Sequence, residues 1–176
     1  MKTAATLALL SSLIVLVLAA FTAGGRSARP RLVEASYFRA EMHGVIHVSP
    51  HGTARFGVAD DRDGGPGVLT LSLGGNSADA SVLFTRTDGS RLAPGTYAIN
   101  GRDDGASGIR ALVMAGSATH PTGVFRGRSG YLVITLASDS VIRGRFELDA
   151  TGFLASDPAD ETRSISATGM FIATRQ

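Results

Sequence analysis

YLVITLASDSVIRGRFELDA (131–150) contains the pattern that decides the fold of this 176-residue chain. Two runs rich in β-branched and aromatic residues, 131–137 and 141–150, are separated by the three residues SDS. In the second run charged and apolar residues alternate, which is the period of a half-buried β-strand. The segment therefore predicts an antiparallel hairpin with one polar and one apolar face. The polar face of its second strand would carry Arg143, Arg145 and Glu147, and the apolar face Ile142, Phe146 and Leu148.

The same alternation recurs along most of the chain from residue 35 onward. Turn-forming residues separate the apolar runs, and no helical period is present in this part. We expect one antiparallel all-β domain over 35–176, with about nine or ten strands. The other expected strands cover 37–48, 53–58, 67–73, 80–87, 96–99, 109–115 and 163–175, and 49–52 is expected to be a turn.

Alternation alone leaves two architectures open, a β-sandwich and a curved open or closed barrel. Both place alternate residues of each strand inside, so the pattern is the same for the two. Gly44 and Gly144 each fall on the apolar face of an expected strand. Glycine at such positions indicates bulges or sharp coiling, which favours a curved sheet.

The first 23 residues have the composition of a secretory signal peptide. Lys2 precedes an apolar run from Ala4 to Ala20, and cleavage is expected between Ala19 and Ala23. The alternative is an uncleaved helical anchor, because the run approaches the ~20 residues that span a bilayer. Residues 24–34 read as a linker. Either way we expect an exported domain, which is periplasmic, secreted or anchored and facing outward.

Composition narrows the possible partners of the exported part. Removing Lys2 from the 17 basic residues leaves 16 arginines against 15 acidic residues, a net charge of +1. A near-neutral domain lacks the basic field that nucleic-acid binding needs. The chain has no cysteine, so neither a disulfide nor a lipid-modified cysteine is present.

Three of the four histidines lie in HGVIHVSPH (43–51), four residues apart. On a strand His43 and His47 would be ~13 Å apart, too far to share an ion that binds nitrogen at ~2.1 Å. We therefore favour no metal site here. A metal at either histidine would need partners from neighbouring strands.

Two similar five-residue segments, VFRGR (124–128) and VIRGR (141–145), contain the candidate ligand-binding residues. If the chain folds back between the two copies, four guanidinium groups gather and can bind a phosphate, a sulfate or an acidic glycan. The alternative is a solvated face on which Glu147 and Asp149 pair with the arginines. The anion-binding candidates are Arg126, Arg128, Arg143 and Arg145.

Four motifs of the C-terminal half fit one pattern: GTY within PGTYAI (94–99), G-x-L-x-I-T at 130–135, I-x-G-x-F at 142–146 and G-x-F at 169–171. In these the chain resembles small exported bacterial all-β proteins of unknown function, over about 80 residues. Those proteins are often lipoproteins, and this chain departs from them by lacking the acylated cysteine. The resemblance implies an envelope or secreted location and no known catalysis. It carries over no functional residue.

We therefore expect an exported binding or structural domain of the bacterial cell envelope, with no enzymatic activity and no cofactor. Its partner would be an envelope protein or a glycan, with membrane contact only through an uncleaved N-terminal segment. One alternative is a lipocalin-like barrel that carries a small apolar ligand. Its cavity would be lined by Phe38, Met42, Leu71, Phe146 and Phe171, and the idea fails if these side chains fill the space.

The second alternative is a metal-dependent or hydrolytic enzyme. It requires His43 or His47 to converge with acidic residues in a cleft. The chain has no cysteine and no G-x-S-x-G sequence, and its acidic residues lie mainly in expected loops. No catalytic residue is therefore assigned.

Overall fold

The computed structural model describes residues 35–59, 68–74, 79–86, 88, 90–99, 108–117, 120–158 and 161–176. The expected signal segment and linker, 1–34, lie outside these residues. The described part is all-β and forms a ten-stranded sheet. The strands are β1 (Tyr37–Gly44), β2 (His51–Gly52), β3 (Ala54–Ala59), β4 (Val68–Leu73), β5 (Ala80–Arg86), β6 (Gly95–Ala98), β7 (Arg110–Ser117), β8 (His120–Ala137), β9 (Val141–Leu154) and β10 (Arg163–Arg175).

Hydrogen-bonded pairs join these strands in the order β2–β1–β10–β3–β4–β5–β7–β8–β6, and β9 pairs with both β10 and β8. The path that leaves β10 through β3, β4, β5, β7, β8 and β9 therefore leads back to β10. The described pairs between strands are antiparallel apart from β10 with β3, where Ala173–Arg175 runs parallel to Ala54–Phe56.

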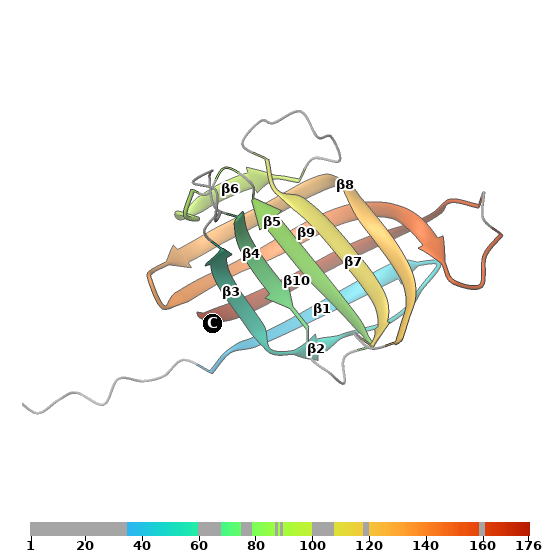
Figure 1. Ribbon diagram of the computed structural model, residues 1–176, viewed down its shortest axis with the longest axis horizontal. Coiled ribbons are helices and arrows are strands. Elements are labelled where there is room, and N and C mark those ends of the chain that lie inside the picture. Colours follow the sequence, from blue (N-terminus) through green and yellow to red (C-terminus); the bar gives the residue numbers. More distant parts are fainter. Residues whose placement is uncertain are drawn as a thin grey trace, which may run out of the picture. The chain divides into compact units, whose positions relative to one another are not determined.

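Within residues 35–176 the strands lie in two layers that cross at a steep angle (Figure 1). Strands β3, β4, β5 and β7 lie in front, and β9, β10 and β1 run behind them. The long strand β8 belongs to both parts, because its first half pairs with β7 and its second half with β6. The long antiparallel pairs of β9 with β8 and β10 hold the rear layer together.

The apolar faces of the two layers meet in a single hydrophobic core. Phe84 of β5 packs edge-on against Phe146 of β9, with ring centroids 5.3 Å apart, and so joins front to rear. The buried set described here contains no polar or charged residue. Core stability in this chain therefore rests on apolar burial and the hydrogen-bonded strand pairs, without help from disulfides.

The sequence correctly placed β3, β4, β5, β6, β10 and the hairpin of β8 with β9. It was wrong at the end of β1, which was expected to continue to residue 48 but ends at Gly44. The backbone φ of Gly44 is +123°, a conformation that side-chain-bearing residues rarely adopt, and the chain turns there. The segment expected to be only a turn, 49–52, contains the short strand β2.

Strand β8 is the other departure from expectation. The sequence predicted a strand only from residue 131 in this region, whereas one strand runs from His120 to Ala137. Register shifts in the β8–β9 pair fall at Gly127/Ser129 and at Ile134/Leu136. Gly144 lies opposite the second irregularity, and a Cβ there would come within 2.4 Å of the Val133 carbonyl oxygen. Glycine is therefore required at 144 by the close approach of β8 to β9.

Replacing Phe146 or Arg145 by alanine tests this assignment of faces. Phe146 is 2% exposed and packs against Phe84, so Phe146→Ala should lower the free energy of unfolding by about 3 to 5 kcal/mol. Arg145 is exposed on the opposite face, and Arg145→Ala should change it by less than about 0.5 kcal/mol. The measurement is urea unfolding of both variants beside the unsubstituted protein. Equal and small effects would contradict the assignment.

Candidate functional site

A hollow of about 630 Å³ lies where several strands end on one side of the described domain, and is called the end hollow here. Its apolar wall comes from the end of β3, the start of β4, the segment before β6 and the β8–β9 turn. Most of these side chains also belong to the core, so the wall is rigid and preformed. The lining residues are Phe56, Val58, Leu69, Arg91, Leu92, Ala137, Ser138, Asp139, Ile142 and Arg175.

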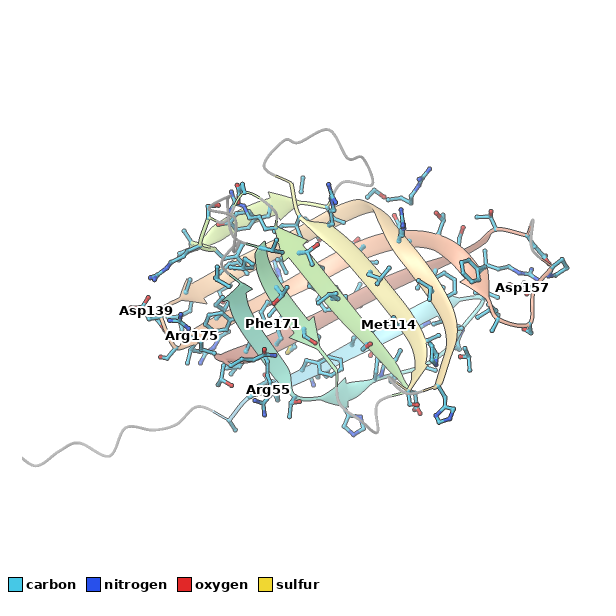
Figure 2. The ribbon with its side chains drawn as sticks, viewed as in Figure 1. Arg55, Met114, Asp139, Asp157, Phe171 and Arg175 are labelled. Atoms are coloured by element: carbon cyan, nitrogen blue, oxygen red, sulfur yellow. The ribbon has the colours of Figure 1, made fainter. Side chains whose placement is uncertain are left out.

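Three charged residues line the end hollow together with the apolar wall. Arg91 forms an ion pair with Asp139 of the β8–β9 turn. Arg175 is exposed near the end of β10, where its backbone N–H donates to the Ser140 carbonyl oxygen at 3.1 Å. Figure 2 shows Asp139 and Arg175 at the same end of the domain, with Asp157 at the other. Among the described residues no acid pairs with Arg175.

The segment that carries Arg91 is held in place by local contacts. Leu92 is 5% exposed and anchors the segment in the core. The Tyr97 hydroxyl donates to the Ala93 carbonyl and accepts from the Ala93 N–H, both at 2.8 Å. The guanidinium of Arg86 lies over the Tyr97 ring, 5.4 Å from its centroid. The wall of the end hollow is therefore ordered by contacts independent of any ligand.

A second hollow of about 680 Å³ lies on the outer face of the rear layer, and is called the outer groove here. One row across the strands contains Arg145, Met170, Arg39 and His51, and the next contains Tyr131, Glu147, Thr168 and Glu41. Basic and acidic side chains therefore alternate along β9 and β1, and the groove has no dominant sign of charge. These eight residues line it together with Ala40, Ser49, Phe146 and Gly169.

The structure does not bring the four predicted anion-binding arginines together. Arg126 of β8 lies opposite Thr151 of β9, and Arg128 lies at the register shift next to it. Arg145 is six residues from Thr151 along β9, which corresponds to about 20 Å. Arg143 and Arg145 do share one face of β9, and all four arginines are exposed. Anion binding by these residues stays a prediction, with the two pairs acting separately.

The acids expected to pair with these arginines have hydroxyl partners. Asp149 accepts a hydrogen bond from the Ser129 hydroxyl at 3.2 Å. Glu147 accepts one from the Tyr131 hydroxyl at 2.5 Å. Arg145 lies beside Met170 of β10, and Met170 separates it from Arg39 of β1 in the same row. Arg39 was not singled out from the sequence, since only strand pairing brings β1 near β9.

The structure corrects the expectation that His43 and His47 are a strand-length apart. Because β1 ends at Gly44, His47 returns to His43, and the His43 Nδ1 and His47 Nε2 atoms are 2.9 Å apart. The rings pack edge to face at a centroid distance of 4.6 Å. In the described residues no group of three or more histidines, cysteines or acids could hold a metal ion.

The five residues named for an interior ligand cavity are all part of the packed core. Phe38, Met42, Leu71, Phe146 and Phe171 are each 0–2% exposed. They fill the interior, and of these five Phe146 also borders the outer groove. Sequence reasoning missed the end hollow because its lining comes from strand ends and from the segment before β6.

Comparisons with protein-family models, with curated proteins and with solved structures found no match to this chain. The resemblance to small exported bacterial β-proteins therefore stays a prediction. In the described part of the chain there is no helix long and apolar enough to cross a membrane.

Tyr131 offers a direct test of the outer groove. Its hydrogen bond to Glu147, followed by the negative charge of that carboxylate, raises the pKa of Tyr131 above its ordinary value. This stabilising contribution is present below the ordinary tyrosine pKa and is lost as pH rises through the raised value. Glu147→Gln should therefore lower the pKa of Tyr131, as followed by tyrosinate absorbance and assigned with Tyr131→Phe.

Glu41→Gln is the matched control for this titration. Glu41 lines the same groove, but Thr168 separates it from Glu147 in the same row. Its substitution should leave the pKa of Tyr131 nearly unchanged. An unchanged pKa in Glu147→Gln, or an equal shift in the control, would contradict the proposed contact.

Proposed function

We propose that this chain is an exported binding module of the bacterial cell envelope, built as a closed β-barrel. Its ligand would be a small amphiphile, with the apolar part in the end hollow and an anionic head at Arg175. The observation that supports this function best is the combination, in one preformed hollow, of apolar side chains with the Arg175 guanidinium, which pairs with no acid among the described residues.

The barrel architecture is supported by the strand pairing. β10 has β9 along one edge and both β1 and β3 along the other, so the sequence of pairs returns to its start. Closure would leave no long free edge in that circuit, which suits an exported domain without disulfides. Gly144 lies within β9 opposite a register shift of β8, and the curvature expected there agrees with this choice over a sandwich.

The ligand class follows from the chemistry of the end hollow. Small-molecule sites generally occupy 300–1,000 Å³, combine apolar side chains with a few polar groups and occur, among other places, at the mouths of barrels. The end hollow has a volume of about 630 Å³ and falls within this range. Asp139 balances Arg91, which leaves Arg175 to attract an acidic group. A ligand with a short alkyl or aromatic body and a carboxylate fits this arrangement.

Export is supported by the sequence of the first 23 residues, with Lys2 followed by an apolar run and small residues near Ala19–Ala23. A binding module outside the cytoplasm would meet amphiphiles of the envelope. The packed, wholly apolar core supplies the stability that such a domain needs without disulfides.

Titration with laurate and with dodecanol, followed by calorimetry, tests the proposed function. The unsubstituted protein should bind both. Val58→Trp should abolish binding of both, because Val58 is 36% exposed and a larger ring there would occupy the end hollow. Arg175→Ala should weaken laurate binding at least fivefold and leave dodecanol binding unchanged, since the alcohol has no charge for the guanidinium.

Arg145→Ala, which removes an arginine from the outer groove, is the control and should bind both ligands normally. Unaltered laurate binding by Val58→Trp would show that the ligand binds elsewhere. Failure of the unsubstituted protein to bind either compound would reject the amphiphile proposal.

A further inference from the structure

The contact between His43 and His47 is built by the backbone. Gly44, with a φ of +123°, turns the chain directly after His43. The Met42 and Val48 backbones then exchange two hydrogen bonds, N···O 2.9 Å and 3.3 Å, across this turn. The two histidines are therefore held on facing sides of a short, closed loop.

The loop is also attached to the neighbouring strand. The Val45 N–H donates to the Ser164 carbonyl of β10 at 3.3 Å. Ala40 N–H of β1 donates to the Pro50 carbonyl at 2.9 Å, beyond the loop. These contacts fix the path of the main chain on both sides of His47. The approach of the rings follows from that path.

The distance between the ring nitrogens suits a shared metal ion. Imidazole nitrogens bind zinc-like ions at about 2.0–2.1 Å, and bond angles of 90–110° place two such nitrogens about 2.9–3.4 Å apart. His43 Nδ1 and His47 Nε2 are 2.9 Å apart, at the lower end of that range. A small rotation of the two rings would direct both nitrogen lone pairs at one ion, which would lie to the side of the line that joins the nitrogens.

Glu41 lies next to His43 on the side of the ring that does not face His47, where an outer-sphere partner of a metal site would lie. Its Oε2 atom is 3.9 Å from His43 Nε2, the nitrogen that does not face His47. Metal-binding histidines generally direct their second nitrogen to a carboxylate, which sets the tautomer and makes the ring a better ligand. At 3.9 Å the two atoms are not hydrogen-bonded, but a rotation of the exposed Glu41 side chain would bring its carboxylate close enough to accept a proton from Nε2, which would leave Nδ1 as the donor to the ion.

We propose that His43 and His47 form a two-point surface site for a divalent first-row transition ion, Cu²⁺ or Zn²⁺, with Glu41 as a positioning residue. Two imidazoles without thiolate select ions of this class, and Cu²⁺ binds more tightly than Zn²⁺. The His43 side chain is 54% exposed, so water completes the coordination. The site is independent of the proposed amphiphile function, because neither histidine lines the end hollow.

An ion bound by both histidines would link His47, in the loop after Gly44, to His43 of β1 and so stabilise the folded protein. Only the folded chain holds both nitrogens at this distance, so the ion binds the native state in preference to the unfolded one. The melting temperature should therefore rise with ion concentration. The rise would depend on both rings.

The test is calorimetric titration with CuCl₂ and with ZnCl₂, joined to thermal unfolding at each ion concentration. The unsubstituted protein should bind one equivalent, more tightly for Cu²⁺, with an increase in melting temperature. His43→Ala and His47→Ala should each lose at least tenfold in affinity together with that increase. Glu41→Gln should bind several-fold more weakly and keep the one-to-one ratio.

His51→Ala is the matched control, because His51 is an exposed histidine that follows the same loop on β2. It should bind like the unsubstituted protein. Both ligand histidines are exposed, so their substitutions should leave the unfolding transition without metal intact. Equal affinity in His47→Ala, an equal loss in His51→Ala, or no binding by the unsubstituted protein would each overturn the proposal.

Discussion

Strand β10 is paired along both of its edges, and the arrangement of the other strands depends on that. Along one edge it forms a long antiparallel pair with β9. Along the other edge, Tyr37–Gly44 of β1 pairs with Ile165–Ile172 of β10, and β3 pairs with Ala173–Arg175. The second pair is parallel and only three residues long. It nevertheless connects the front layer to the rear one and completes the circuit of strands.

The inward side chains of β10 explain how two crossing layers come close enough to share a core. Ala167 and Ala173 are small and almost fully buried, and Phe171 is the one large ring among them. At Gly169 an added Cβ would come within 2.6 Å of the Phe146 ring. The space left by these small residues is occupied by rings from the neighbouring strands. Within the described residues these rings form a packed core, and the end hollow and the outer groove lie outside it.

The sequence predicted the strands well where alternation was uninterrupted. In β9 charged or hydroxyl residues occupy every other position from Arg143 to Thr151, and the buried face contains the predicted Ile142, Phe146 and Leu148. It failed where glycine altered the path. Gly44 ended β1 early, and in β8 the glycines of the 123–130 segment concealed a continuous strand. Periodicity does not distinguish a glycine inside a strand from one that ends it.

The candidate sites were less predictable, because they depend on pairing between distant segments. Arg145 was chosen from its own strand, whereas its neighbour Arg39 comes from β1, more than a hundred residues away. Arg175 and Val58 meet in the end hollow through the short β10–β3 pair. His43 and His47 are close only because the expected strand turns. The first two sites thus required pairing between distant segments, and the third required a turn at Gly44, which the alternating pattern did not reveal.

The β10–β3 pair is the shortest connection in the proposed closed circuit of strands. Nuclear Overhauser measurements on labelled protein test it most directly, through contacts between the backbones of Arg55 and Thr174. We expect these parallel-strand contacts together with the antiparallel ones between Ala167 and Leu148. Clear β9–β10 contacts with none between Arg55 and Thr174 would show an open sheet and contradict the proposed barrel.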